Sequence, residues 1–347
     1  HGKEGLMLFE KAFRDHFICR EDFETIKALG SNSIRVPFHY KLFCQGSGEG
    51  SLEQGFVYLD QVIKWAQEFQ IWVILDFHAA PGGQNPEWHS DSDGTARLWT
   101  DRKAQRDTIL IWEKIAHRYL EEDYLAGYDC LNEPATDHEQ LNSFYKELIS
   151  AIRQIDHKRL FFIEGNVWST DLKCLECFDD GQYVLSAHFY EPIQYTFNLR
   201  PHLDYPTSGG IAAWDASVTR SVMRKHQETA DAHGVPLHVG EFGINYRLNH
   251  FNEAQWLSDV LETFEEMNIH WHYWTFKAVK NNVCPDGLFS FYENPQWVNR
   301  MGKSYGWDNY AELWDKHHEE IIQSWRSDHF LPNEELIKVI QKYAPNP

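Results

Sequence analysis

Short apolar runs alternate along the chain with longer segments in which apolar residues recur every three or four positions. The run IWVILDF at 71–77 is almost continuously apolar, as is typical of a strand buried on both faces. The segment before it, 55–69, carries apolar residues at helical spacing: Phe56, Leu59, Val62, Ile63, Ala66 and Phe69. The same alternation continues and predicts strands at 31–38, 71–77, 125–131, 159–165, 183–189, 235–243 and 269–276.

Helical periodicity fills the intervals between these strands, at 55–69, 105–120, 139–155, 212–233 and 253–267, and returns in the last fifty or so residues. Repeated strand–helix units predict an α/β fold with a parallel sheet covered by helices. Seven strands are one short of a closed (β/α)8 TIM barrel, and a Rossmann-like sheet is the alternative. No GxGxxG motif follows a strand, which counts against the Rossmann-like sheet. Because no linker or composition break interrupts the pattern, we predict one catalytic barrel domain spanning 1–347.

Composition narrows the class of partner. The chain has 52 acidic and 32 basic residues, so its formal net charge is −20. Such a chain repels nucleic acids and anionic membranes, and a neutral ligand is favoured. The chain has 14 Trp, 16 Tyr and 22 Phe, which suit either a large aromatic core or a cleft lined with rings. It begins at His1, so a removed signal peptide is compatible with it, and the sequence does not decide between a secreted, periplasmic or cytoplasmic location.

Polar and aromatic residues gather where the predicted strands end. These residues are Arg35, Asp76-Phe77-His78, Asn132-Glu133, Glu164 (followed by Trp168), His188-Phe189-Tyr190, Glu241 and Trp274. In a barrel the carboxyl ends of the strands form the catalytic rim. One polar residue at a strand end means little, but the repetition indicates a site there.

Two carboxylates stand out in this group, because Glu133 and Glu241 each follow an apolar strand directly and come from well-separated strands. Cleavage of a glycoside needs such a pair, one to protonate the leaving oxygen and the other to attack or support the sugar carbon. Arg35 is expected to stabilise the carboxylate of Glu241, and His188 and Tyr190 to orient a carboxylate. Each of these residues taken singly has an ordinary structural explanation.

The combined set resembles glycoside hydrolase family 5, the cellulase-like retaining β-glycosidases. The matching motifs run in order from residue 35 to residue 274: NSIRVP, LDFHAAPGGQN, LNEP, SAHFY, VGEFG and HYWTF. The resemblance implies that Glu133 is the acid/base and Glu241 the nucleophile. It implies supporting or substrate-binding roles for a further six residues: Arg35, His78, Asn132, His188, Tyr190 and Trp274. It implies no metal or cofactor, and it predicts carboxyl groups about 5–5.5 Å apart, the spacing of a retaining enzyme.

Two segments depart from the family pattern. The family places a strand before the one containing NSIRVP, but the chain offers only GLMLF at 5–9 there. We therefore expect a poorly represented first strand, and a missing segment or partner chain that completes the barrel, because an open strand edge is a liability. The second segment is the aromatic-rich 286–307, which fits either a wall of the substrate cleft or a loop packed under the last helix.

The substrate is predicted as a neutral oligo- or polysaccharide, first a β-glucan with β-1,4 or β-1,3 linkages. The run AAPGGQN resembles the loop of exo-acting β-1,3-glucanases of the family. A β-mannan and a glycoside with a non-sugar aglycone are alternatives. Two readings without glycosidase chemistry remain: a metal-dependent hydrolase built on His270 and His272 with His188 and His78, and a carbohydrate-binding barrel without catalysis.

Overall fold

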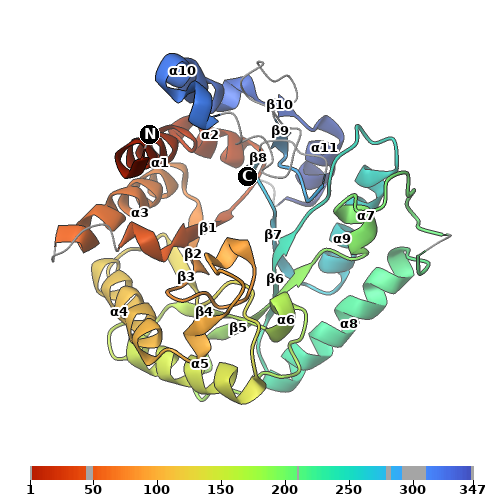
Figure 1. Cartoon of the computed structure of the whole chain (residues 1–347). Helices are drawn as coiled ribbons and strands as arrows, with labels where there is room; N and C mark the ends of the chain where they lie inside the picture. The colour runs from red at the N-terminus through yellow and green to blue at the C-terminus, as the bar shows by residue number, and fades with distance from the viewer. Residues whose placement is uncertain (1, 44–49, 209–210, 279–282, 291–309, 345–347) are drawn as a thin grey trace.

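The computed structural model describes residues 2–43, 50–208, 211–278, 283–290 and 310–344. Seven parallel strands form one curved sheet in which each strand lies beside the next one along the chain (Figure 1). The strands are β1 (Ser33–His39), β2 (Trp72–Ala79), β3 (Leu125–Asp129), β4 (Leu160–Glu164), β5 (Tyr183–Phe189), β6 (Leu237–Phe242) and β7 (His270–Tyr273).

Helices surround this sheet. The longer ones are α1 (Gly2–His16), α2 (Arg20–Ala28), α3 (Gly50–Phe69), α4 (Arg102–Arg118), α5 (His138–Arg153), α8 (Ala216–His233), α9 (Glu253–Glu266), α10 (Tyr310–Ser324) and α11 (Glu334–Tyr343). Single turns are α6 (Asn166–Ser169), α7 (Ile193–Thr196), and the 3₁₀ turns η1 (Tyr40–Leu42), η2 (Trp88–Ser90), η3 (Arg97–Trp99) and η4 (Ser327–His329). A small second sheet contains β8 (Lys277–Ala278), β9 (Phe289–Ser290) and β10 (Leu331–Pro332).

The architecture is that of a nearly closed TIM barrel, as predicted. All seven expected strands are present in register as parallel neighbours, from Ser33 opposite Trp72 to Val239 opposite Trp271. Apolar faces of the helices pack on the outside of the sheet and form the main core, in which Trp112, Tyr128 and Phe161 are fully buried. The strand–helix alternation of the sequence therefore corresponds to the layers of the fold.

The expected weakness at the first strand is confirmed, because GLMLF lies inside α1. Phe9 and Phe13 are one helical turn apart and both pack edge-on against Trp325, with ring centroids 5.7 and 5.1 Å apart. A strand would place these two rings differently along the chain, so their shared partner on the C-terminal segment favours the helix. Among the described residues, the sheet therefore has seven strands and two free edges, on β1 and β7.

The interior of the barrel changes character along its axis. A small apolar cluster of Ile74, Phe162 and Val184 fills it near the amino ends of the strands. Further along the same strands the inward side chains become polar, as at Asp76, Glu164 and His188, all buried. The packed lower half supports a polar upper half, which opens at the rim where active sites of barrels lie.

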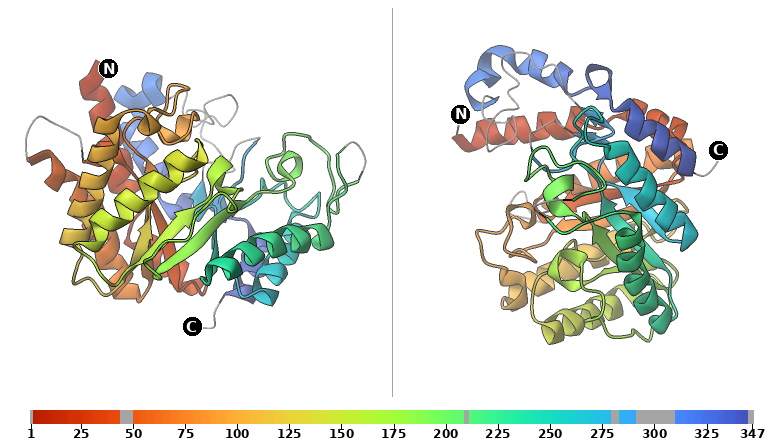
Figure 2. Two further views of the ribbon diagram at one scale, coloured as in Figure 1. Left: turned by 90° about the horizontal axis from the view of Figure 1, so that it is seen from below. Right: turned by 90° about the vertical axis from the view of Figure 1, so that its right-hand side faces the viewer.

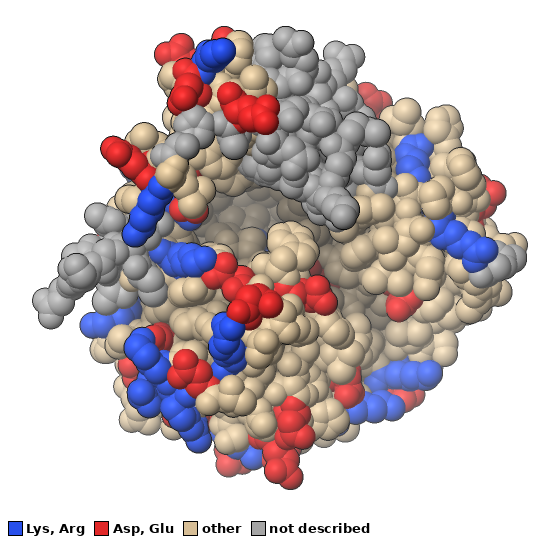
Figure 3. Space-filling model, in the orientation of Figure 1, with Lys and Arg blue, Asp and Glu red and all other residues tan. Residues whose placement is uncertain are grey.

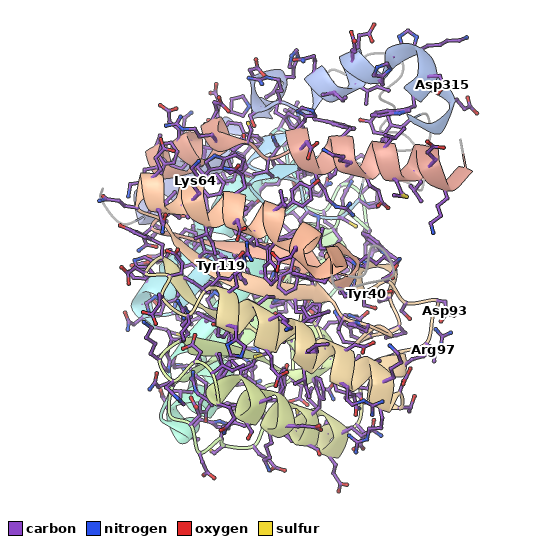
Figure 4. All side chains as sticks on the ribbon, turned by 90° about the vertical axis from the view of Figure 1, so that its left-hand side faces the viewer. Tyr40, Lys64, Asp93, Arg97, Tyr119 and Asp315 are labelled. Atoms are coloured by element: carbon purple, nitrogen blue, oxygen red, sulfur yellow. The ribbon has the colours of Figure 1, made fainter. Side chains whose placement is uncertain are left out.

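Loops after the strands rise above this rim. Figure 4 shows Tyr40, Asp93 and Arg97 on this side of the molecule, whereas Lys64 and Tyr119 lie along the outer helices. The segment 286–307, predicted to be a cleft wall or a packed loop, lies mostly outside the described residues. No helix in the described ranges combines the length and apolar character that a bilayer span requires.

Candidate active site

Glu133 stands at the end of the third strand in a backbone conformation that few residues adopt. Its φ angle is +49°, in the left-handed region that costs free energy for a residue with a side chain. Its backbone N–H donates to Oε2 of Glu164 at 2.6 Å, and the N–H of Asn132 donates to the carbonyl of Phe77 at 3.1 Å. Pro134 follows and offers no N–H to continue the ladder. Neighbouring strands thus hold the turn that presents Glu133.

Two imidazoles contact the Glu133 carboxylate. His188 Nδ1 is hydrogen-bonded to Oε1 at 2.8 Å, and His89 Nε2 lies 3.0 Å from Oε2. Burial raises the pKa of Glu133, but the hydrogen bonds from His188 and His89 outweigh burial and bring that pKa below its ordinary value. Burial lowers the pKa of His188, but the carboxylates of Glu164 and Glu241 outweigh it and hold that pKa well above its ordinary value. These opposite shifts of the two pKa values favour a Glu133 carboxylate beside a protonated His188.

Glu241 comes from β6 and is also nearly buried. Arg35 Nη1 donates to its Oε1 at 2.7 Å, and the Tyr190 hydroxyl donates to its Oε2 at 2.8 Å. Both donors are fixed, one by an ion-pair network and the other by its position after β5. Each carboxylate oxygen is thus held by one strong donor, which fixes the orientation of the carboxylate.

Arg35 joins side chains from several strands. Its other nitrogens donate to Asp129 Oδ2 at 2.7 Å, Asn132 Oδ1 at 2.8 Å and Glu164 Oε1 at 2.9 Å. Asp76 Oδ2 lies 3.2 Å from the same guanidinium. Burial acts to lower the pKa of Arg35, but these carboxylates raise it well above its ordinary value, so the guanidinium stays charged. One buried cation therefore connects five of the seven strands.

Glu164 was noted in the sequence as a strand end and given no role, but it lies at the centre of the network. Its Oε2 also accepts the hydroxyl of Ser169, which is placed by three consecutive left-handed residues with φ of 54°, 53° and 60° at Val167, Trp168 and Ser169. Burial raises the pKa of Glu164, but His188 and Arg35 outweigh it and lower that pKa to about 2. The backbone strain in this turn is offset by a charge-assisted hydrogen bond to a buried carboxylate.

The two predicted catalytic glutamates face each other. An oxygen of Glu133, an oxygen of Glu241 and a ring nitrogen of His188 all lie within 4.8 Å of one another. His188 Nδ1 is 3.6 Å from Glu241 Oε2, so the imidazole stands between the two carboxylates. His188 Nε2 lies 3.2 Å from Glu164 Oε1, an ion-pair distance at an angle too poor for a hydrogen bond.

The remaining predicted residues line the same region. His78 is hydrogen-bonded through Nδ1 to Asp76 Oδ2 at 2.7 Å, and its ring lies parallel to that of Trp274, with centroids 5.3 Å apart and planes 3° apart. Asn132 accepts from Arg35 through Oδ1, while its Nδ2 has no hydrogen-bond partner among the described residues. The structure thus brings all eight predicted residues to one site, and leaves one buried amide donor for a ligand.

Several residues of the site have no signal in the sequence. His89 lies in the loop after β2, where no periodicity or strand end marks it. Gln84 donates through Nε2 to the carbonyls of His78 and Asn132 at 2.7 and 2.9 Å, and Asn85 Nδ2 donates to the carbonyl of Glu133 at 2.9 Å. Gln84 and Asn85 stand in the quoted AAPGGQN run, so a search for polar residues within that motif would have found them.

The two HxH histidines of the metal-hydrolase alternative lie apart from the glutamates, whereas its other two residues, His188 and His78, lie in the site. His272 is hydrogen-bonded to His238 and Ser33, and His270 is exposed. Within the described ranges, two groups are close enough to share a metal ion: Glu133, His188 and Glu241, and separately His138, Asp171 and Cys174. Neither group contains His270 or His272, so the geometry does not support a metal site on the HxH motif.

The site opens to solvent through the rim. Figure 3 shows a hollow at the centre of the face that Figure 1 views along the barrel axis. Trp88, in the loop after β2, is 76% exposed, and the centroid of its ring lies 5.9 Å from that of His89. The loop after β2 therefore brings an exposed aromatic ring next to the imidazole that contacts Glu133.

Comparison with known proteins identifies the family of the chain. Residues 8–280 match the family described as "Cellulase (glycosyl hydrolase family 5)". The chain is 31% identical to a β-xylosidase of Phanerodontia chrysosporium over 300 residues, which cover 80% of this chain and 60% of that protein. It is 27% identical over 306 residues to endoglucanase C of Acetivibrio thermocellus, covering 78% of this chain and 88% of the relative.

Solved structures share the fold. A glycoside hydrolase superposes with a TM-score of 0.69 at 21% identity, covering 93% of this chain and 92% of that one. The endoglucanase Cel5A of Thermotoga maritima superposes with a TM-score of 0.67 at 18% identity, covering 93% and 90%. These superpositions establish the barrel fold, and the match of residues 8–280 to the family model establishes the family. The chain therefore belongs to glycoside hydrolase family 5.

Proposed function

We propose that this barrel is a retaining β-glycosidase in which Glu241 is the nucleophile and Glu133 the acid/base. The observation that supports this most is the approach of a Glu133 oxygen and a Glu241 oxygen to within 4.8 Å. Retaining enzymes hold their carboxyl groups about 5–5.5 Å apart, whereas inverting enzymes leave roughly 6.5–9.5 Å for a water molecule. The short approach favours direct attack by a carboxylate.

The reaction proceeds by double displacement. Glu241 attacks the anomeric carbon and forms a glycosyl ester, while Glu133 donates a proton to the departing oxygen. Glu133, now a carboxylate, takes a proton from water, and the resulting hydroxide oxygen attacks the same carbon. The ester bond breaks, Glu241 regains its charge, and the sugar leaves with its β configuration retained.

The neighbours have distinct parts in this mechanism. Arg35 and Tyr190 keep both oxygens of Glu241 oriented for attack, and the charge that they stabilise returns in the second step. The proton that Glu133 gives to the leaving group reaches it from His188 along their 2.8 Å hydrogen bond. Asn132 Nδ2 is the donor available to a sugar hydroxyl. The indole of Trp274 is the surface on which the apolar face of the sugar ring stacks.

The substrate that these features support best is a neutral β-linked saccharide, first a β-glucan. The relatives' names include endoglucanase, β-xylosidase and glucan 1,3-β-glucosidase, and one Cel5A structure is described as a complex with mannotriose. An assay on separate substrates distinguishes the linkage of a β-glucan, a β-mannan, and a glycoside with an aryl or lipid aglycone. A carbohydrate-binding barrel without catalysis would bind the same sugars and release none.

The decisive test measures sugar release from β-glucan, laminarin, carboxymethyl-cellulose, glucomannan, xylan and aryl β-glycosides. Wild type is compared with Glu241→Gln, Glu133→Gln and the exposed surface control Glu228→Gln. We expect release by wild type and the control, loss in both site variants, and a β-anomeric first product by proton NMR. An α-anomeric first product or full activity of Glu241→Gln would contradict the proposal.

A further inference from the structure

A cluster of metal-binding side chains lies away from the glutamates, where the loop after β3 meets the loop after β4 (both visible beside α5 and α6 in Figures 1 and 2). It consists of His138, Asp171 and Cys174, and one ligand atom of each lies within 4.8 Å of the other two. His138 is exposed and begins α5, whereas Asp171 and Cys174 are half-buried and follow the α6 turn. The double-displacement mechanism uses none of these three side chains.

The backbone holds two of these ligands in place before any ion binds. Asp171 and Asn166 form an antiparallel bridge in which each N–H donates to the carbonyl of the other at 3.0 Å. Asp171 Oδ1 accepts the N–H of Lys173 at 3.1 Å, and Asp171 Oδ2 lies 3.8 Å from His138 Nε2. The thiol of Cys174 donates to the carbonyl of Asp171 at 3.1 Å. The carboxylate and the sulfur are therefore preorganised in one short loop.

A buried amide fixes the third ligand relative to the other two. Asn142 Nδ2 donates to the carbonyl of His138 and to the carbonyl of Cys174, both at 2.8 Å. Its Oδ1 accepts the N–H of Glu176 at 2.8 Å, and the residue is only 3% exposed. Hydrogen-bonding partners behind the ligands are typical of metal sites, because they orient the groups that meet the ion.

We propose that His138, Asp171 and Cys174 bind one Zn²⁺ ion. Zinc ligands lie about 2.0–2.3 Å from the ion, so their atoms are at most about 4.6 Å apart, and a small rotation of the exposed imidazole brings all three into range. Imidazole and thiolate favour zinc over Mg²⁺ and Ca²⁺, which prefer oxygen ligands. Burial raises the pKa of the Cys174 thiol, so the ion displaces its proton to solvent, and water takes the fourth position.

The ion would connect the loop that carries the acid/base to the loop that supports it. Asn166 Oδ1 accepts the N–H of Thr136 at 3.0 Å, and Asn166 Nδ2 donates to the carbonyl of Thr136 at 2.8 Å. Thr136 follows Glu133 closely in sequence, and Asn166 follows Glu164. Zinc adds a second connection further along the same two loops and restricts the turn at Glu133. This effect on the acid/base rests on the proposed function, whereas ion binding does not.

The first test titrates the metal-free protein with Zn²⁺ and with Co²⁺. We expect a single Zn²⁺ to bind per chain, and Co²⁺ to give the near-ultraviolet charge-transfer band of a thiolate ligand. Cys174→Ser should abolish this band, and both Cys174→Ser and His138→Asn should weaken Zn²⁺ binding by about 100-fold or more, since loss of an outer partner alone costs about 10–100-fold. Cys177→Ser and His157→Asn are matched controls at exposed residues outside the cluster and should bind as wild type does.

Two results of these titrations would overturn the proposal. One is a cobalt–thiolate band that persists in Cys174→Ser or disappears in Cys177→Ser. The other is Zn²⁺ binding that survives in His138→Asn and is lost in Glu241→Gln, because the ion would then lie between the two glutamates. Circular dichroism of each variant without metal shows whether it is folded, and the conservative Cys174→Ser change carries the test if His138→Asn is not.

Hydrogen exchange tests the connection between the two loops. At a free Zn²⁺ concentration of about 100 Kd, exchange through openings that release the ion should slow by about 100-fold in peptides covering 133–138 and 166–174. Peptides from α9 are internal controls. Unchanged exchange in the wild type, or equal slowing in Cys174→Ser, would contradict the connection. Neither measurement needs turnover, so Zn²⁺ binding without sugar release from any substrate would refute the proposed function and leave the metal site established.

Discussion

Arg35 Nη1 donates a 2.7 Å hydrogen bond to Glu241 Oε1, and this contact joins the first strand of the sheet to the sixth across the barrel interior. The two residues are 3% and 6% exposed, so water contributes little to their solvation. The same guanidinium also meets Asp129 and Glu164, and each of these bonds crosses the interior rather than running along one strand. The orientation of Glu241 therefore depends on the integrity of the whole upper barrel.

Replacing Arg35 by Lys should damage both stability and activity. An ammonium group cannot reach the several acceptors that the planar guanidinium joins, and unpaired buried carboxylates remain. Loss of one partner of a buried ion pair costs about 3–5 kcal/mol in the free energy of unfolding. Urea unfolding with the exposed pair Arg220–Glu266 as control, through Arg220→Lys, measures this. Equal effects of the two substitutions would contradict the network.

Tyr190→Phe should lower kcat/KM without lowering stability comparably. The substitution removes only the hydroxyl that donates to Glu241 Oε2 at 2.8 Å. A hydrogen bond to a charged group contributes about 1.5–3 kcal/mol, so the expected loss is about 10–100-fold. Tyr195→Phe is the matched control, because its buried hydroxyl donates to the carbonyl of Phe251 instead. A similar loss of kcat/KM in both variants would show that the effect is structural.

Glu164→Gln should reduce kcat while leaving substrate binding nearly intact. Glu164 accepts from Arg35, Ser169 and the backbone of Glu133, and a carboxamide provides only one acceptor oxygen for these donors. The left-handed turn at Glu133 then loses its support, and the acid/base moves away from the leaving oxygen. Steady-state kinetics on an aryl glycoside and on a polysaccharide should show a fall in kcat with a nearly constant KM. A rise in KM alone would assign Glu164 to substrate binding.

A buried pair of histidines predicts acid sensitivity of the fold. His238 Nε2 and His272 Nδ1 are hydrogen-bonded at 2.8 Å, and Ser186 and Ser33 bond their outer nitrogens. Burial and the nearby charges of Arg35 and His270 lower the pKa of His272 to about 3, and burial, His272 and Arg35 lower that of His238 well below its ordinary value.

The lowered pKa values of His238 and His272 determine how the free energy of unfolding changes with pH. The unfolded chain binds protons at both histidines near pH 6.5, whereas the folded chain does not until about pH 3 for His272. The free energy of unfolding should therefore fall as pH drops from about 6.5 toward 3, by about 1.4 kcal/mol per pH unit for each histidine. His238→Asn should reduce that slope by one proton, and the exposed control His250→Asn should keep it. Equal slopes for wild type and His238→Asn would contradict this assignment.

Much of the fold and the eight predicted site residues could be read from the sequence because strand ends are local features. An apolar run that stops at Asn132-Glu133 or at Glu241 predicts both a strand and a position at the rim of the barrel. The central role of Glu164 could not be read in this way, because it depends on Arg35 and on the backbone of Glu133, which are distant along the chain. His89 was missed for the same reason, since a loop residue gains its meaning only from the carboxylate that it meets in three dimensions.

The helix at the N-terminus shows the opposite limit. GLMLF is apolar enough for a short strand, but Phe9 and Phe13 find a shared partner in Trp325 more than three hundred residues away. A sequence pattern reflects only residues that are close along the chain, whereas the helix at GLMLF is favoured by a contact with the C-terminal segment.

The single cation shared by five strands has a consequence for mutational scanning. A library selected only for protein abundance should report Arg35 among the most constrained positions, although it lies at a site built for turnover. Trp88, which is 76% exposed, should tolerate almost any side chain in that selection and become constrained only when sugar release is selected. Comparing the two selections position by position would therefore separate residues that hold the barrel together from residues that contact only the ligand. Arg35 should be constrained in both selections.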